Sequence, residues 1–218
     1  MSETIVTDGR AGRAARTRNA VVDALLALID GGNLRPTARE VADAAGVSLR
    51  SVYVHFDDVE SLFLAASARH YERVQSLVTP WDPEASLDER VDALVTRRIR
   101  IYEVGAQVRK AALMQASGSP ALRRALERGR RAGRVELETL FARELGGVAE
   151  GERVRLLAAL EVVAGAATHE TMSTHPGLDG ADGGVAALMR DLVHATLTAW
   201  GVGRERGTEA RPPHDGPG

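Results

Sequence analysis

The segment from residue 37 to residue 56 constrains this chain most, because it encodes two short helices joined by a tight turn. Thr37 and Glu40 have the spacing of a capping box, in which each side chain satisfies an unpaired backbone N–H at a helix start. Gly46 interrupts the helical pattern and can adopt the positive φ that such a turn often needs. Ser48 is a good cap for a second short helix. We therefore predict a helix-turn-helix here.

The apolar residues of this segment explain how its two helices pack. Val41, Ala42 and Ala45 of the first helix can meet Val47, Val52 and Phe56. Because two of these residues are alanines, the helices can cross closely. With the apolar positions buried, the second helix still exposes a polar face, and a helix of this kind fits the major groove of duplex DNA. We predict that it reads DNA.

The remaining chain repeats apolar residues at helical spacing and shows neither β-alternation nor an internal repeat. The expected fold is all-α, with about nine helices. The predicted helices are 13–29, 37–45, 48–55, 58–77, 86–105, 108–116, 120–145, 151–174 and 185–201. The predicted divisions are a disordered arm at 1–12, a helix-turn-helix DNA-binding domain at 13–56, a helical effector-binding and dimerisation domain at 57–202, and a disordered tail at 203–218.

Several local signals set these boundaries. Asp57 and Glu60 have capping-box spacing before the helix at 58–77. Ser119-Pro120 is a strong start signal, because it combines a cap with a proline at the first helical position. The helix that follows carries many arginines and includes the run Gly-Arg-Arg-Ala-Gly at 129–133, which lies inside a helical pattern.

Composition excludes several classes of protein. The chain has no cysteine, which rules out disulfides, thiolate metal sites and cysteine nucleophiles. No apolar run approaches the ~20 residues that span a bilayer. The first 18 residues are polar and arginine-rich and lack the apolar core of a signal peptide. We expect a cytoplasmic protein without membrane contact.

Charge is distributed unevenly along the chain. Residues 10–56 carry seven arginines against four acidic residues, whereas the whole chain has a net charge of −2. A basic end on an otherwise acidic chain indicates a module that binds a polyanion. The alternative is a solvated arginine-rich face with no partner.

The helix-turn-helix segment and the residues on either side of it resemble the TetR (tetracycline-repressor-like) family. The resemblance rests on Ala-Gly-Val-Ser at 45–48, on Val-Tyr-x-His-Phe at 52–56, on the following Leu62-Phe63, and on a preceding helix of the family's length. It covers roughly residues 13–66. The family implies a homodimeric repressor that binds a palindromic operator and is released by a small-molecule effector. It fixes neither the effector nor the operator.

The resemblance assigns DNA contacts to particular residues. These residues are Thr37, Arg39, Ser48, Leu49, Arg50, Ser51, Tyr53 and His55. Arg50 is the best candidate for reading guanine, because a guanidinium can bond O6 and N7 together. Tyr53 and His55 are expected to hold phosphates, although packing or capping roles remain open for both. The family often has a phosphate-binding lysine where this chain has Val59, so that interaction is either missing or supplied by other groups.

The C-terminal helices are assigned to assembly and sensing. The helices near 151–174 and 185–201 are apolar and rich in small residues, and the family pairs such helices in a dimer; internal core packing is the alternative. Candidate effector contacts are Tyr102, Met114, Gln115, Phe141, Glu161, His169 and Met172. We expect no cofactor and no metal, since His169, Glu170 and His175 lack a supporting third-ligand spacing.

Three rival functions remain open from sequence. An enzyme is disfavoured, because the chain shows no Ser/His/Asp elbow, no phosphate-binding glycine loop and no credible acid pair. An architectural DNA binder without an effector would show little operator preference. An activator cannot be distinguished from a repressor by these residues.

Overall fold

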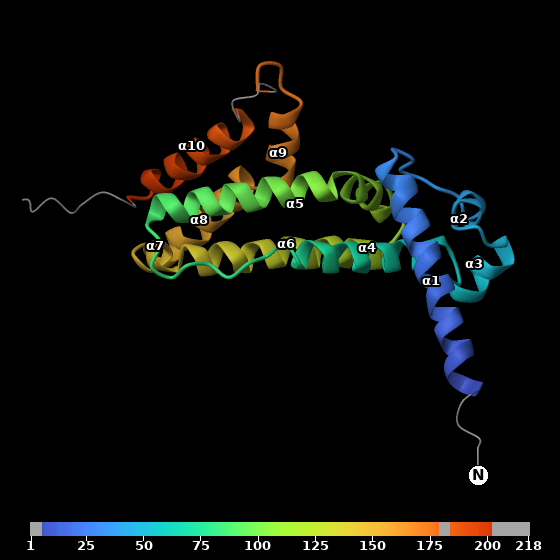
Figure 1. Ribbon diagram of the computed structural model, residues 1–218. Coiled ribbons are helices and arrows are strands. Elements are labelled where there is room, and N and C mark those ends of the chain that lie inside the picture. The colour runs from blue at the N-terminus through green and yellow to red at the C-terminus, as the bar shows by residue number, and fades with distance from the viewer. Residues whose placement is uncertain (1–5, 179–183, 202–218) are drawn as a thin grey trace, which may run out of the picture. The chain divides into compact units, whose positions relative to one another are not determined.

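The computed structural model describes residues 6–178 and 184–201. No strand occurs within these ranges, so the predicted all-α fold is confirmed. The helices are α1 (Val6–Asp30), α2 (Ala38–Ala45), α3 (Leu49–His55), α4 (Val59–Gln75), α5 (Leu87–Ala116), α6 (Pro120–Leu140), α7 (Ala142–Gly146), α8 (Glu150–Val163), α9 (Ala166–Ser173) and α10 (Gly184–Ala199) (Figure 1). None of the described helices is both long and apolar enough to cross a membrane.

The chain divides into two compact units. The first unit comprises residues 1–83 and 96–135, and the second comprises residues 84–95 and 136–218. Helices α5 and α6 therefore contribute residues to both units. The functional division predicted at residue 57 stays a prediction, because compactness follows a different division. The predicted disordered tail lies outside the described residues.

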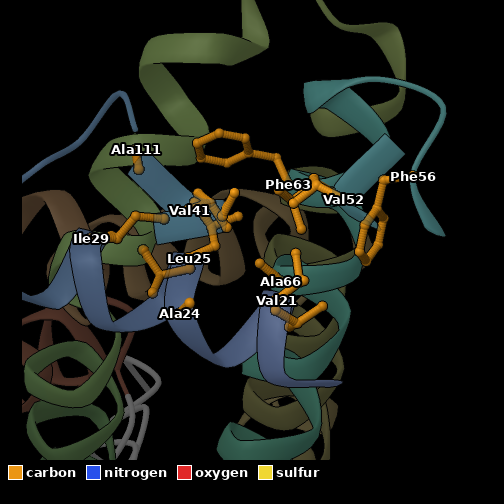
Figure 2. Close-up of a cluster of buried hydrophobic side chains, with 14 of the residues drawn as sticks. Val21, Ala24, Leu25, Ile29, Val41, Val52, Phe56, Phe63, Ala66 and Ala111 are labelled. Carbon is orange, nitrogen blue, oxygen red and sulfur yellow. The ribbon is translucent and has the colours of Figure 1, made fainter. Parts of the chain in front are cut away.

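One apolar cluster forms the core of the first unit (Figure 2). Leu25 of α1, Val52 of α3 and Phe63 of α4 are almost completely buried in it. Ala111 of α5 and Leu122 of α6 belong to the same cluster. Each fully buried side chain of valine size or larger contributes about 1.5–3 kcal/mol through removal of apolar surface from water. The helix-turn-helix therefore does not have a core of its own but shares one with α5 and α6.

The second unit has a separate core between its helices. Met189, Val193 and Leu197 recur every four residues along α10 and are buried. Leu156 and Leu160 of α8 are also fully buried, and α8 contacts α10. The four-residue repeat places one face of α10 against the core, as an amphipathic helix requires.

A buried ion pair adds to this second core. Arg90 of α5 donates to both carboxylate oxygens of Glu144 in α7, at 2.5 and 2.9 Å, and to the carbonyl oxygen of Leu140 at 2.6 Å. Its guanidinium also lies 5.9 Å from the ring centre of Phe141. Burial is the largest single influence on Glu144 and opposes its ionisation, but the hydrogen bonds from Arg90 and from its own backbone and the charges of Arg90 and Arg143 together lower the pKa of that carboxyl. The pair ties the start of α5 to α7.

Two of the predicted helix boundaries near glycines are wrong. The segments predicted as 86–105 and 108–116 form one helix, α5, because Gly105 does not end it. Gly105 is buried beside His70, and a Cβ there would lie 2.8 Å from the imidazole Nε2. The helix predicted at 151–174 instead breaks into α8 and α9 at Gly165, where a Cβ would lie 2.6 Å from the carbonyl oxygen of Glu161.

Three further boundaries also differ from the prediction. Helix α1 begins at Val6, inside the arm predicted as disordered, and Arg13 donates from Nε to the carbonyl oxygen of Gly9. Phe141 leaves helical geometry and is fully buried, so the helix predicted at 120–145 becomes α6 and α7. Helix α4 begins at Val59 and is capped by Asp58.

Candidate nucleic-acid interface

The predicted capping box at the start of α2 is present. The Thr37 hydroxyl accepts a hydrogen bond from the Glu40 N–H at 3.2 Å, and the Glu40 carboxylate accepts from the Thr37 N–H at 2.7 Å. The Thr37 hydroxyl also donates to the same carboxylate at 2.7 Å. These bonds from the hydroxyl and backbone of Thr37 lower the pKa of Glu40. A phosphate contact at Thr37 would therefore use the outward N–H groups of the first turn of α2.

Gly46 forms the turn between α2 and α3. Its φ of 66° and ψ of 31° lie in the left-handed region that glycine adopts without strain. Its N–H donates back to the carbonyl oxygens of Ala42 and Asp43, which closes α2. Ser48 then caps α3 by accepting from the Ser51 N–H at 3.1 Å. The predicted helix-turn-helix geometry is thus present in detail.

Helix α3 is anchored on one side and exposed on the other. Val52 and Phe56 are 2% and 3% exposed and fix the helix in the core of the first unit. On the opposite side, Tyr53 is 51% exposed and Val54 is 71% exposed, and Arg50 is also exposed. Arg50, Tyr53 and Val54 follow an i, i+3, i+4 spacing, which places them on one face. We call these three residues the reading face.

The other predicted contact residues surround this face with differing exposure. Thr37, Arg39 and Ser48 are assigned DNA contacts at the start of α2 and α3, and all three are exposed. Leu49, Ser51 and His55 are half-buried.

Val54 is absent from the eight predicted contact residues, although its spacing from Arg50 marks the same face. Its side chain is the most exposed large apolar group of α3. An exposed apolar side chain here is suited to contact with a thymine methyl group.

Arg18 of α1 packs against the residue that follows α3. Its guanidinium lies 5.0 Å from the ring centre of Phe56, while the side chain remains exposed. The arginine-rich sequence by itself allows either a DNA-backbone role or a solvated arm. The structure adds a packing role, because the cation lies over the aromatic residue that anchors α3.

The start of α4 differs from the prediction. The capping box is formed by Asp58 and Ser61, whose N–H donates to the Asp58 carboxylate at 2.7 Å, and not by Asp57 and Glu60. Val59, at the position where the family often has lysine, is half-buried against the apolar cluster. This side chain serves packing, so any phosphate contact at the start of α4 must come from other groups.

A polar clamp connects α4 to α1. Arg69 donates to the Asp23 carboxylate at 2.6 Å and to the Asn19 amide oxygen at 2.8 Å. Beside it lies a small pocket of about 180 Å³. Its lining residues are Asp23, Leu26, Asp30, Arg69, His70, Arg73, Val104 and Val108. None of the predicted effector residues lines this pocket.

The predicted effector residues fall into both compact units. Tyr102, Met114 and Gln115 belong to the first unit, and Phe141, Glu161, His169 and Met172 belong to the second. Met114 is 41% exposed, whereas Phe141 is fully buried in the core around Arg90. Within residues 6–178 and 184–201, no three His, Asp or Glu side chains gather as metal ligands do. The effector assignments stay predictions.

Two short helices joined by a glycine turn, with an anchored second helix that exposes a polar and aromatic face, define a helix-turn-helix DNA-binding domain. Residues 21–66 match the model of a family described as bacterial regulatory proteins, tetR family. This match lies within the segment whose resemblance to the family was predicted from sequence, and that resemblance is confirmed there. A search of curated protein sequences finds no match.

Solved structures support the same fold over most of the chain. A transcriptional regulator from Rhodococcus sp. Rha1 has a TM-score of 0.63 and 18% identity, covering 85% of this chain and 96% of that one. A TetR transcription regulator from Haloarcula marismortui has a TM-score of 0.61 and 18% identity, with coverages of 85% and 98%. A putative TetR-family regulator from Mesorhizobium loti has a TM-score of 0.57 and 22% identity, with coverages of 86% and 96%. At these identities the comparison shows the fold alone.

Proposed function

We propose that this TetR-family regulator is a cytoplasmic homodimeric repressor that binds a palindromic operator through α3 and releases it when a small-molecule effector binds. The observation that carries the DNA-binding part is the reading face. Arg50, Tyr53 and Val54 are exposed together on a helix whose other side is held by Val52 and Phe56. A rigid helix with an exposed guanidinium can present two donors to the O6 and N7 atoms of guanine.

The base-reading role can be tested by selecting bound duplexes from a random pool. We expect a palindromic consensus, because a twofold dimer presents two reading helices about 34–36 Å apart or more. Arg50→Ala should relax the preference at one step of each half-site. Arg100→Ala is a matched control, since Arg100 is an exposed arginine of α5 outside the reading face. Equal loss of affinity for every sequence in Arg50→Ala would contradict the base-reading role.

Dimerisation is proposed through α8 and α10. Val154, Ala158 and Val162 lie at four-residue spacing on α8, and the two valines are 70% and 66% exposed. Ala195 is exposed on α10, which contacts α8. An exposed apolar face with small neighbours suits close packing against a second copy. Because the predicted helix at 151–174 is broken, α8 is the part that supports this proposal.

Sedimentation of a charged variant tests the dimer. Val154→Glu together with Val162→Glu should give a monomer, because two buried carboxylates would be desolvated without partners. Met114→Glu is the control, since Met114 is an exposed apolar residue of the other unit. A dimer that survives the double substitution would place the interface elsewhere.

Release by an effector rests on the family alone, and its test is independent of the site residues. Compounds that raise the thermal midpoint of the free protein should lower its affinity for the selected operator. The reason is linkage, since a ligand shifts an equilibrium only by its differential affinity for the two states. Stabilising compounds that leave operator affinity unchanged would favour a regulator without effector release.

A further inference from the structure

Helix α6 carries a concentration of positive charge that lies outside the reading face and has no role in the proposed function. Between residues 120 and 135 there are six arginines and one acidic residue, in a chain whose net charge is −2. This part of α6 belongs to the first unit, which also contains α3. The six are Arg123, Arg124, Arg128, Arg130, Arg131 and Arg134.

Part of this charge has a structural role. Arg123 donates to the carbonyl oxygens of Ala116 and Ser117, which closes the end of α5. Arg130 pairs with Glu127, the one acidic residue of the segment. Among the others, Arg124, Arg128 and Arg131 are exposed and occupy i, i+4 and i+7 positions. This spacing places them on one side of the helix, and we call them the arginine face.

The arginine face contains two like-charge pairs, Arg124 with Arg128 and Arg128 with Arg131, and Glu127 is the one acidic residue among them. Like charges three and four residues apart on a helix repel one another, and this segment contains several such pairs. Gly129 lies in the helix interior, where a Cβ would meet no atom within 4 Å, so packing does not require this glycine. A segment that served only to cover the core would not need either feature. An anionic partner would offset the repulsion.

The start of α6 is fixed to the DNA-binding helices. The Ser119 hydroxyl donates to the carboxylate of Glu60, in the first turn of α4, and also accepts from the Leu122 N–H at 3.0 Å. Leu122 is buried in the cluster that contains Val52 of α3. The arginine face is therefore carried on the same compact unit as the reading face. Any duplex bound by α3 brings a dense row of phosphates to this unit.

We propose that the arginine face of α6 is a second DNA-contacting surface, which binds backbone phosphates outside the base pairs read by α3. This inference rests on the proposed function, because α3 must first bring the duplex to the protein. The interaction is independent of sequence, since phosphates carry no base information. It adds affinity and salt dependence for long DNA without changing the consensus.

The test compares two duplexes that share the selected operator. The short duplex contains the operator alone, and the long duplex extends it by about 15 base pairs of arbitrary sequence on each side, roughly 50 Å. Binding is measured by fluorescence anisotropy across a salt series. The test variant is Arg124→Gln/Arg128→Gln/Arg131→Gln, and the charge-preserving control is the same triple changed to Lys.

We expect the Gln triple to bind the short duplex as the wild type does. On the long duplex it should bind about tenfold more weakly at low salt, and its salt slope should fall by about 1 for each arginine that no longer neutralises a phosphate, roughly 3 in all. The Lys triple should keep the wild-type slope. Arg128→Gln alone should lower the slope by about 1, which provides a milder second variant should the triple fold poorly.

Two results would overturn the inference. The first is equal binding of the Gln triple and the wild type on both duplexes, and the second is an equal decrease in affinity on both lengths. If the first result comes with weaker binding of the triple to vesicles of phosphatidylserine and phosphatidylcholine, the face is assigned to a membrane. Failure of the proposed function is distinguishable, because wild-type protein would then not prefer the operator over a scrambled core of the same length.

Discussion

Arg50 of α3 and Arg90 of α5 show two opposite uses of the same side chain. Arg50 is exposed on a helix that is anchored from behind. Arg90 is buried, with both of its terminal nitrogens bonded to Glu144. If Arg50 reads DNA as proposed, recognition and stability use different arginines in this chain. An exposed arginine such as Arg50 stays hydrated and contributes little to folding, whereas a buried one must be paired within the fold.

Removing one partner of the buried pair should have the largest effect. Arg90→Met leaves the Glu144 carboxylate, only 10% exposed, without its counter-charge. We expect a loss of about 3–5 kcal/mol in the free energy of unfolding, measured by urea denaturation. Arg90→Met combined with Glu144→Leu should recover most of that loss, because the orphaned charge is gone. A single substitution that costs under about 1 kcal/mol would break the comparison.

The corresponding change in the reading face should affect binding and leave stability unchanged. Arg50→Ala should lower operator affinity by about 1–3 kcal/mol, because it removes the side chain proposed to hydrogen-bond one base pair. The free energy of unfolding should stay within about 0.5 kcal/mol of the wild type, because the side chain is exposed. Isothermal titration and urea denaturation measure the two quantities. A large loss of stability would show that Arg50 belongs to the fold.

Two glycines test the backbone of the turn and of α6 in the same way. Gly46→Ala forces a side chain into left-handed geometry and should destabilise the protein by about 1–2 kcal/mol. Gly129→Ala is the matched control, because it lies inside α6 with open space at its Cβ and should stabilise by about 0.5–1 kcal/mol. Thermal unfolding compares them. Shifts of the two thermal midpoints in the same direction would contradict the turn geometry.

The smallest expected effects are on the pH dependence of stability, which involves His70 in the first unit and Glu144 in the second. Burial, reinforced by Arg73 and opposed by Asp30, lowers the pKa of His70. Above about pH 6.5, the ordinary pKa of histidine, His70 is neutral in both the folded and the unfolded chain and does not affect the free energy of unfolding. Below that pH the unfolded chain takes up the proton first, so the free energy of unfolding decreases. The lowered pKa of Glu144 adds stability above about 4.3 that is lost at more acidic pH.

Unfolding midpoints across a pH series can assign these two losses. His70→Gln should remove the loss at mildly acidic pH. Removing both Arg90 and Glu144 should remove the loss at lower pH. The unfolded chain binds the proton more tightly in both cases, so stability must decrease with acid; an increase over either range would show that the burial or the pairing is wrongly described.

The reading helix could be predicted because its signals are local. The Thr37–Glu40 capping box and the positive φ of Gly46 each follow from residues close in sequence. The four-residue spacing of Val52 and Phe56, which are buried while Tyr53 and Val54 are exposed, can also be read from the sequence. A short segment with cap, turn and apolar spacing leaves few alternatives.

The errors occur where a distant residue decides the structure. Gly105 lies inside α5, where the absence of a side chain leaves room for His70, a residue far away in sequence. The α4 cap is a local exception, because Asp57 and Asp58 each have a possible partner three residues further on, Glu60 and Ser61. The predicted effector residues share only their residue type and a place on predicted helices. Type alone could not show that Phe141 completes a core with Arg90 while Met114 faces outward.

The central claim is that α3 distinguishes one base pair from another, and a competition experiment tests it most directly. Purified protein is bound to the selected duplex at moderate salt and challenged with random duplex of equal length. We predict a specificity ratio of at least about a thousandfold, as sequence-specific regulators show. A ratio near one, with the protein folded and dimeric, would contradict the account.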